Sequence, residues 1–192
     1  KDADMVICAN GGVAHAMKLG IVPQLVVGDL DSLAENQKEW MDRNRVRAAV
    51  HSRDKDYTDT HLALKEAIGR SPDEVVMLGC IGDRMDHTLS NIFLLLECAK
   101  AGIKAKIMDE INEMYVVGPE RELELTGAEG QFVSLVPLTT AVSGIFTSGL
   151  KYRLRGDSLE MRESRGISNE FTEKKALVKV KSGFLLVVKI SG

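Results

Sequence analysis

The sequence has little of several features that mark particular classes of protein. Only 5% of its 192 residues are aromatic, whereas 44% are hydrophobic and 28% charged, a composition of globular rather than disordered or fibrous proteins. Its three cysteines, Cys8, Cys80 and Cys98, are odd in number and form no Cys-x-x-Cys pair. This scarcity argues against structural zinc and fits a reducing cytoplasm.

Long apolar runs and clusters of like charge are also missing. The longest apolar runs, Ile92–Leu96 and Phe184–Val188, fall far short of the roughly 20 residues that span a bilayer. The first four residues, Lys-Asp-Ala-Asp, are charged where a signal peptide would be apolar. No run of five like charges occurs, and the formal net charge is −3. We therefore expect a soluble, cytoplasmic protein with no nucleic acid or membrane partner.

Residues 1–118 alternate short β-type apolar runs with helical patterns, which predicts a doubly wound, mostly parallel sheet. Strands are expected at Met5–Ala9, Leu25–Gly28, Arg47–Val50, Glu74–Gly79 and Ile103–Met108, and helices at Glu35–Arg43, Asp59–Gly69 and His87–Ala101. In the last helix, Leu89, Ile92, Phe93 and Leu96 recur at three- and four-residue spacing.

From Pro119 onward the pattern is antiparallel β. Short alternating runs such as Glu122–Leu125 and Leu177–Lys181 follow one another between glycine turns. Residues 1–118 hold 14 Lys and Arg against 19 Asp and Glu, a net charge of −5, whereas residues 119–192 hold 11 against 9, a net charge of +2. We expect an α/β domain over 1–118 followed by an all-β, sandwich-like domain over 119–192.

Acidic residues and glycines follow the predicted parallel strands. In a doubly wound sheet, ligands bind beyond the carboxyl ends of the strands. Asp29, Asp31, Asp56 and Asp59 would meet at that edge, and crowded carboxylates repel one another unless they are protonated or bound to a cation. Mg²⁺ prefers carboxylate oxygens, water and phosphates, and the i, i+2 spacing of Asp29 and Asp31 on an extended segment would place them on one side.

Each residue also has a purely structural interpretation. Ser32 with Glu35 makes a capping box, Asp86 or Thr58 could cap the following helix, and Asp59 suits a first helical turn. Only the combination of the four aspartates favours a site.

Groups suited to phosphate accompany the carboxylates. Gly11 and Gly12 follow a strand and precede a helix, so their backbone N–H groups could face an anion. Gly82 and Arg84 supply a second glycine loop with a guanidinium, and His87 and Asn91 share a helix face beside it. The P-loop and protein-kinase glycine motifs and the Gly-x-Ser-x-Gly elbow are all absent from the sequence. Metal-assisted phosphoryl chemistry is the leading class.

These residues and their spacing resemble the thiamine pyrophosphokinase family. The matching segments, in chain order, are Gly11-Gly12, Gly28–Ser32 after Pro23, Lys55–Asp59, Gly82–His87 with Asn91, Ser148–Tyr152 and Ser168–Glu170. The resemblance implies transfer of pyrophosphate from ATP to the hydroxyethyl group of thiamine, giving thiamine diphosphate and AMP. It also implies a homodimer whose thiamine pockets combine the α/β half of one chain with the β half of the other.

The resemblance further implies a role for each matched residue. Asp29, Asp31, Asp56 and Asp59 would be the Mg²⁺ and phosphate-site carboxylates, with Asp56 or Asp59 as proton acceptor. Arg84 and Asp86 would act in catalysis, and Gly11, Gly12, Gly82, His87 and Asn91 would bind the nucleotide. Tyr152, Ser168 and Asn169 would form the thiamine side.

The chain departs from the family pattern in places. Asn10 stands where the family usually has aspartate, Val13-Ala14 replaces Ala-Asn, and Tyr152 replaces a tryptophan. Relative to the family, we expect about one upstream strand with its loop to be lacking.

Three rival functions remain open at this point. They are a pyrophosphokinase for another hydroxymethyl heterocycle such as a pterin, a Mg²⁺-dependent phosphohydrolase, and a non-catalytic nucleotide or thiamine sensor. The Ser148–Tyr152 and Ser168-Asn169 segments argue against the first rival, the lack of a nucleophile motif against the second, and the four carboxylates against the third.

Overall fold

A computed structural model describes residues 3–52, 54, 56–119 and 121–190. The chain forms two compact units, residues 1–72 and residues 73–192.

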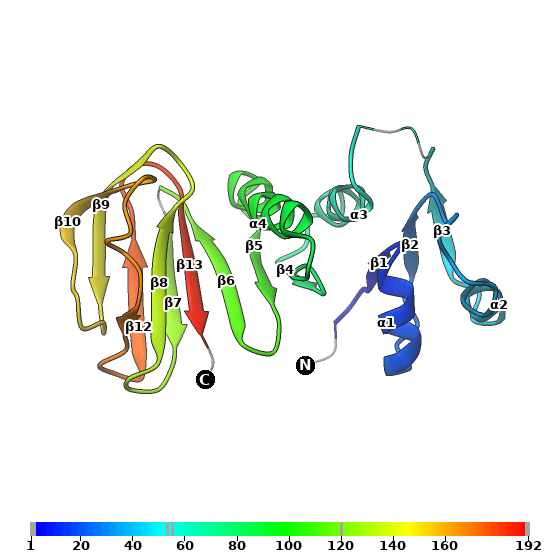
Figure 1. Ribbon diagram of the computed structural model, residues 1–192, viewed down its shortest axis with the longest axis horizontal. Helices are drawn as coiled ribbons and strands as arrows, with labels where there is room; N and C mark the ends of the chain where they lie inside the picture. Colours follow the sequence, from blue (N-terminus) through cyan, green and yellow to red (C-terminus); the bar gives the residue numbers. More distant parts are fainter. Residues whose placement is uncertain (1–2, 53, 55, 120, 191–192) are drawn as a thin grey trace. The chain divides into compact units, whose positions relative to one another are not determined.

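The first unit is a three-stranded parallel sheet with three helices (Figure 1). Its elements are β1 (Ile7–Ala9), α1 (Gly12–Leu19), β2 (Leu25–Gly28), α2 (Glu35–Arg43), β3 (Arg47–Val50) and α3 (Asp59–Ile68). The strand order is β1-β2-β3, and every residue of the central strand β2 is buried. Helix α3 packs on β1 and β2, and Val13, Val26 and Met41 contribute to the core. The carboxyl ends of the three parallel strands therefore form one edge.

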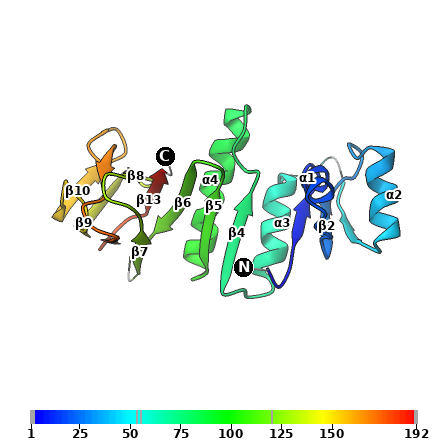
Figure 2. The ribbon, with the colours of Figure 1, turned by 90° about the horizontal axis from the view of Figure 1, so that it is seen from below.

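The second unit begins as α/β and continues as antiparallel β. Its elements are β4 (Glu74–Leu78), α4 (Met85–Lys100), β5 (Lys104–Met108), β6 (Asn112–Val117), β7 (Glu122–Thr126), β8 (Phe132–Pro137), β9 (Ala141–Ser148), β10 (Arg155–Glu160), β11 (Asn169–Glu170), β12 (Lys175–Lys179) and β13 (Leu185–Ile190). One sheet has the order β11-β8-β13-β6-β5-β4 and the other β10-β9-β12-β7. Strands β4 and β5 are parallel, the other pairs are antiparallel, and α4 lies against β5 (Figure 2).

The two sheets of this unit form a sandwich. Its core combines side chains of both sheets, with Leu135 and Val187 from the six-stranded sheet and Ile145 and Val178 from the four-stranded one, each at most 1% exposed. Burial of apolar surface stabilises a fold by about 25 cal/mol per Å², so this shared core holds the two sheets together.

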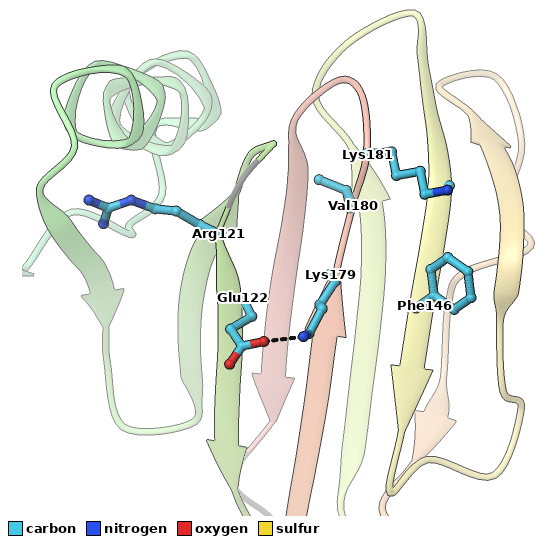
Figure 3. A pocket seen from close by; sticks show the side chains of 7 residues that line it. Arg121, Glu122, Phe146, Lys179, Val180 and Lys181 are labelled. Atoms are coloured by element: carbon cyan, nitrogen blue, oxygen red, sulfur yellow. Dashed lines mark ion pairs between the residues drawn. The ribbon is translucent and has the colours of Figure 1, made fainter.

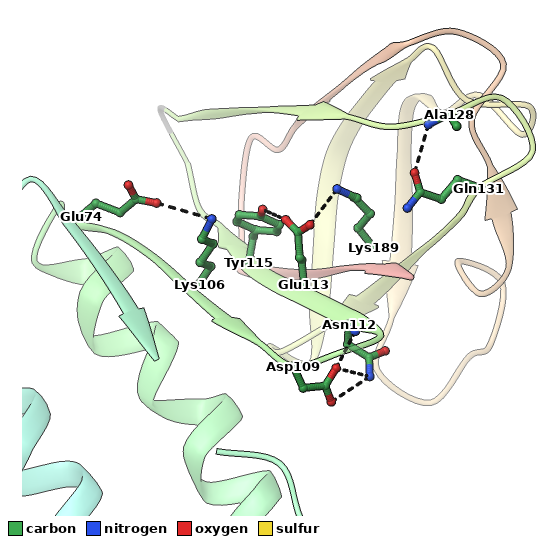
Figure 4. A network of polar contacts seen from close by, with 9 residues as sticks. All are labelled: Glu74, Lys106, Asp109, Asn112, Glu113, Tyr115, Ala128, Gln131 and Lys189. Carbon is green, nitrogen blue, oxygen red and sulfur yellow. Dashed lines mark hydrogen bonds and ion pairs between the residues drawn. The ribbon is translucent and has the colours of Figure 1, made fainter. Parts of the chain in front are cut away.

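A row of polar contacts crosses the six-stranded sheet (Figure 4). Lys189 Nζ lies 2.8 Å from Glu113 Oε1, the Tyr115 hydroxyl donates to Glu113, and Lys106 Nζ lies 3.9 Å from Glu74 Oε1. Burial, and then the hydrogen bond to Glu113, raise the pKa of Tyr115 well above its usual range. Strands from both sides of residue 118 thus share one sheet and one polar network.

The predicted fold class is confirmed: a mostly parallel α/β part precedes an antiparallel β part. Helix α2 has the predicted bounds, but two local interpretations are wrong. The N-cap of α2 is Ala34 and not Ser32, and the Gln37 side chain accepts a hydrogen bond from the Ala34 N–H. Helix α4 buries Leu94, Leu95 and Cys98, while Leu89 and Phe93 are exposed.

No helix in the described ranges combines the length and the apolar character needed to cross a membrane.

Candidate active site

Asn10 is the centre of a polar cluster at the carboxyl ends of β1 and β2. Its side chain is only 5% exposed, and Nδ2 donates to Asp29 Oδ1 and to Ser32 Oγ, both at 2.8 Å. Both amide hydrogens are therefore in use. Oδ1 of Asn10 is buried and has no hydrogen-bond partner in the part of the chain that the structure describes.

Asp59 approaches the same place from the first turn of α3. A Cβ built on Gly28 would lie 2.9 Å from the Asn10 Cβ and 3.2 Å from the Asp59 Cγ. The missing side chain of Gly28 thus leaves room for both Asn10 and Asp59 beside the end of β2. Asn10 therefore borders both Asp29 and Asp59. The strand-edge argument expected Asp29, Asp31, Asp56 and Asp59 to meet, and of these only Asp29 and Asp59 lie beside Asn10 among the described residues.

The segment after β2 is a turn and not an extended strand, so the i, i+2 argument for Asp29 and Asp31 is wrong. Leu30 has a φ of 61°, in the left-handed region, and the Asp31 backbone N–H donates to Asp29 Oδ1 at 3.2 Å. A short polar side chain that bonds the backbone two residues on is typical of such turns. Asp31 lies at the surface.

The start of α3 follows from its own sequence. Thr58 is the N-cap, and its hydroxyl accepts a hydrogen bond from the His61 N–H at 3.2 Å. The Tyr57 ring packs against His61 in an edge contact and lies 3.5 Å beneath the Lys65 ammonium. Asp56 is exposed in the preceding loop, and Lys55 lies outside the described residues.

The carboxylates do not form a ready-made metal cage. Within residues 3–52, 54, 56–119 and 121–190, no group of three or more His, Cys, Asp or Glu side chains is placed to hold a metal ion. Mg²⁺ commonly uses only one or two protein carboxylates, with water and substrate phosphates completing its shell. Asp29, held through one oxygen, and the adjacent Asp59 fit that mode of binding.

Two glycine loops begin helices, with different use of their N–H groups. Gly11 is the N-cap of α1, and a Cβ there would meet nothing within 4 Å. The Gly82 N–H instead donates to the Thr88 hydroxyl at 3.2 Å, and this hydroxyl in turn donates to the Gly82 carbonyl. Asn91 is buried on α4, and its Nδ2 donates to the Cys80 carbonyl at 2.9 Å, so Asn91 ties the loop that contains Cys80 and Gly82 to α4.

Arg84 and Asp86 form an exposed pair at the start of α4. Their side chains are joined by two hydrogen bonds, at 3.1 and 2.5 Å. The hydrogen bond from Arg84 is the main cause that lowers the pKa of Asp86 to about 2. The N-cap of α4 is Arg84, so Asp86 lies in the first turn rather than capping the helix, and His87 is exposed beside it.

The segment after β9 presents Tyr152 to solvent. Gly149 turns the chain with a φ of 71°, and a Cβ there would lie 2.0 Å from the Lys175 carbonyl oxygen, so only glycine fits. Leu150 is then fully buried, and Tyr152 is 60% exposed. The Lys151 ammonium lies 5.5 Å from the Tyr152 ring centre and 3.0 Å from Glu170.

Asn169 fixes the backbone of Tyr152. Its Oδ1 accepts from the Tyr152 N–H at 2.9 Å, and its Nδ2 donates to the Tyr152 carbonyl at 2.8 Å. The side chain is 5% exposed, so Asn169 supports the site from within. Ser168 is exposed with a φ of 58°, and its N–H donates to the Ser134 hydroxyl. Thr88 and Ser134 are supporting residues that the sequence analysis did not identify.

A groove of about 300 Å³ lies on the outer face of the four-stranded sheet (Figure 3). It is lined by Arg121, Glu122, Gly144, Phe146, Lys179, Val180 and Lys181. Lys179 pairs with Glu122 on the neighbouring strand. Cross-strand ion pairs are typical of the water-facing side of an antiparallel sheet, and the groove contains none of the predicted site residues.

An α/β part with polar side chains at its strand ends, followed by a β-sandwich, is the architecture of a protein that can bind a ligand beyond the carboxyl ends of its parallel strands. The family model "Thiamin pyrophosphokinase, catalytic domain" matches residues 1–107, and "Thiamin pyrophosphokinase, vitamin B1 binding domain" matches residues 118–185. The chain belongs to the thiamin pyrophosphokinase family.

Individual relatives agree with this assignment. Thiamine pyrophosphokinase of Bacillus subtilis is 28% identical over 184 residues, covering 95% of this chain and 86% of the relative. The crystal structure of the Bacillus subtilis protein has a TM-score of 0.90 at 26% identity, covering 100% of this chain and 90% of that one. A family protein from Enterococcus faecalis has a TM-score of 0.82 at 27% identity, covering 97% and 88%.

Proposed function

We propose that this chain is an ATP:thiamine diphosphotransferase, which moves the pyrophosphoryl group of ATP to the hydroxyethyl oxygen of thiamine and releases AMP. The observation that carries the proposal is the match of both family models, in order, along one chain. The matched residues of the α/β half also follow the carboxyl ends of parallel strands, where such sheets bind ligands.

Residues 1–118 would bind ATP and residues 119–192 thiamine. The thiamine hydroxyl attacks the β-phosphorus in line, and AMP leaves. The transition state of such a transfer is loose, so positioning and charge neutralisation carry most of the catalysis. Asp59 or Asp56 accepts the hydroxyl proton, while Arg84 and the N–H groups of Gly11 and Gly12 bind phosphate oxygens. On the nucleotide side, Gly82, whose N–H donates to the Thr88 hydroxyl, and Asn91, which donates to the Cys80 carbonyl, would shape the second loop. His87 would contact the nucleotide from the surface.

Mg²⁺ would be held by Asp29 and Asp59, with Asp31 and Asp56 reaching it directly or through water. When bound, it neutralises charge on the phosphates. Asp29 keeps one oxygen fixed by the Asn10 amide and the Asp31 N–H, which supports its role as a ligand with a defined orientation.

On the thiamine side, Tyr152 would supply an aromatic face for the cationic vitamin, a contact of about 0.5–2 kcal/mol. Ser168 would contact the ligand from the surface, and Asn169 would act by holding the Tyr152 backbone. The 60% exposure of Tyr152 leaves its side chain accessible to a ligand.

The test of the reaction is a product assay with thiamine, Mg²⁺ and ATP labelled at the α-phosphorus. The label should appear in AMP, in amounts equal to the thiamine diphosphate formed. Labelled ADP would indicate stepwise transfer of single phosphates. Phosphate release without thiamine would indicate a hydrolase, and either result would contradict the proposal. A hydroxymethyl pterin offered in place of thiamine is the specificity control.

We also propose a cytoplasmic homodimer with composite thiamine pockets. The opposite net charges of residues 1–118 and 119–192 favour contact between the two halves. Mixing an Asp59→Ala chain with an Asn169→Ala chain, at a temperature where both are folded, should raise the activity above that of either chain alone, up to about a quarter of the wild-type activity, because random exchange gives mixed dimers with one intact site. Demonstrated exchange without recovered activity would contradict composite pockets.

A further inference from the structure

The cluster around Asn10 contains a side chain to which neither the carboxylate motif nor the glycine loops assign a task. Asn10 is buried, and among the residues that the structure describes its side-chain amide donates only to Asp29 and Ser32. Ser32 lies in the turn that follows Asp29, so one amide ties both ends of that turn to the end of β1. Because both side-chain hydrogen bonds of Asn10 end in the turn that contains Asp29, Asn10 controls the orientation of the Asp29 carboxylate.

The orientation of the Asn10 amide is determined by its neighbours. Reversing the amide would direct its oxygen at the Asp29 carboxylate, which can only accept hydrogen bonds. The observed orientation instead satisfies both donors and leaves Oδ1 without a partner among the described residues. The buried oxygen is thus left unpaired while both N–H groups make hydrogen bonds. The structural role of the side chain is therefore that of a donor to Asp29 and Ser32.

Asp29 is held asymmetrically as a result. Oδ1 accepts from the Asn10 amide at 2.8 Å and from the Asp31 N–H at 3.2 Å. Across the residues that the structure describes, Oδ2 makes no hydrogen bond. A carboxylate fixed through one oxygen offers the other in a constant direction, which is what a hard cation with few protein ligands requires.

We propose that Asn10 is a positioning residue, which fixes Asp29 so that its free oxygen meets the magnesium ion carried by the nucleotide phosphates. This inference rests on the proposed function. The Asn10 amide can hold Asp29 in place even when no cation is bound. An aspartate at position 10 would instead bring two carboxylates to within about 2.8 Å of each other, which is unfavourable unless a proton or a metal lies between them.

The first experiment measures binding without turnover. Calorimetry with Mg²⁺ and a non-hydrolysable α,β-methylene analogue of ATP compares the wild type with Asn10→Ala and Asn44→Ala. Asn44 is the matched control, because its exposed amide also donates one hydrogen bond at 2.8 Å, to the Trp40 carbonyl at the far end of α2. We expect Asn10→Ala to bind the magnesium analogue about tenfold more weakly, the effect of losing a hydrogen bond to a charged group. Affinity equal to that of Asn44→Ala would overturn the proposal.

The second experiment exchanges the two side chains. Asn10→Asp alone should lower the melting temperature in EDTA, and added Mg²⁺ should raise it by more than it raises that of the wild type. The double variant Asn10→Asp with Asp29→Asn restores an amide facing a carboxylate with the polarity reversed, so the melting temperature in EDTA should recover. Its affinity for the magnesium analogue should stay low, because the carboxylate is now at the wrong position.

The outcomes separate a positioning role from a merely structural one. Recovery of stability without recovery of binding supports the proposal, whereas recovery of both would show that either position can carry the metal ligand and would overturn it. No recovery of stability would show that the two side chains do not form the pair described. The proposed function fails separately, if the wild type forms no thiamine diphosphate while these binding differences hold.

Discussion

Asn10 and Asn169 are equally buried and hold their neighbours in different ways. Asn169 uses both its donor and its acceptor on the main chain of Tyr152, and its polar groups are satisfied. Asn10 uses only its donors, on the side chains of Asp29 and Ser32, and leaves its oxygen unpaired. The first residue maintains a backbone shape, whereas the second maintains the orientation of a charge. We therefore expect changes near Asn10 to affect chemistry more than stability, and changes at Asn169 to affect stability first.

The largest effect is expected for Asp29→Asn. Loss of a metal-binding carboxylate should lower kcat/KM on the order of 10²–10³-fold. The melting temperature should change little, because the Asn10 amide can still donate to the carbonyl introduced at position 29. Asp42→Asn, an exposed change on α2, is the control. Near wild-type activity at saturating Mg²⁺ would show that Asp29 is not a ligand.

Asn169→Ala should mainly affect folding. It removes the two bonds to Tyr152 and a third from the Glu170 N–H, all at a buried position. We expect a loss of about 2–4 kcal/mol in the free energy of unfolding, measured by urea titration. Asn169→Asp keeps the acceptor and should lose less. If the alanine variant were as stable as Asn44→Ala, the hydrogen bonds between Asn169 and Tyr152 would not contribute to the stability of the fold.

Tyr152→Ala tests whether the clamped segment serves thiamine. Thiamine affinity should fall by roughly 3–30-fold, equivalent to about 0.5–2 kcal/mol for a cation over an aromatic face, with ATP affinity unchanged. Tyr152→Trp should retain binding because it keeps an aromatic surface. If calorimetry showed that ATP affinity falls while thiamine affinity is unchanged, Tyr152 would contact ATP and not thiamine.

The smallest effect concerns Asn91, a third buried asparagine, which holds the Cys80 carbonyl. Burial raises the pKa of the Cys80 thiol to about 11, so at pH 8 only about one thiol in a thousand is ionised. Alkylation by iodoacetamide should be slow and should rise about tenfold per pH unit up to that pKa. Asn91→Ala should loosen the loop, lower this pKa and speed alkylation several-fold at pH 8.

Peptide mass spectrometry gives the rate at each cysteine, and the buried Cys98, whose pKa is raised to about 11 mainly by burial, serves as an internal reference. A Cys80 that reacts in the wild type as fast as a free thiol would mean that Asn91 does not hold this loop closed.

Much of the fold could be predicted because local patterns decide it. Helix α2 and strands β2 and β3 have the predicted bounds. The buried face of α4 could not be predicted, since it depends on which neighbour covers the helix: Leu94 and Leu95 are inside while Phe93 is exposed. The capping box failed because Ser32 binds Asn10, a residue 22 positions away.

The candidate site shows the same limit. The rule that ligands bind beyond strand ends correctly pointed to the region of Asp29 and Asp59. The turn at Leu30 and the contacts of Asn10 and Asn169 could not be predicted, because they depend on pairings between distant segments. A polar residue between a strand and a glycine, as at Asn10, is the signal that could have drawn attention to the cluster.

The position of β13 has a consequence for how the protein is made. This strand lies between β6 and β8, and it comes after every other strand of the six-stranded sheet in the sequence. During synthesis, β4, β5 and β6 leave the ribosome well before the strand that joins them to the sandwich. Until β13 is made, β6 and β8 lack the strand that pairs with both of them, so the six-stranded sheet is completed only at the end of synthesis.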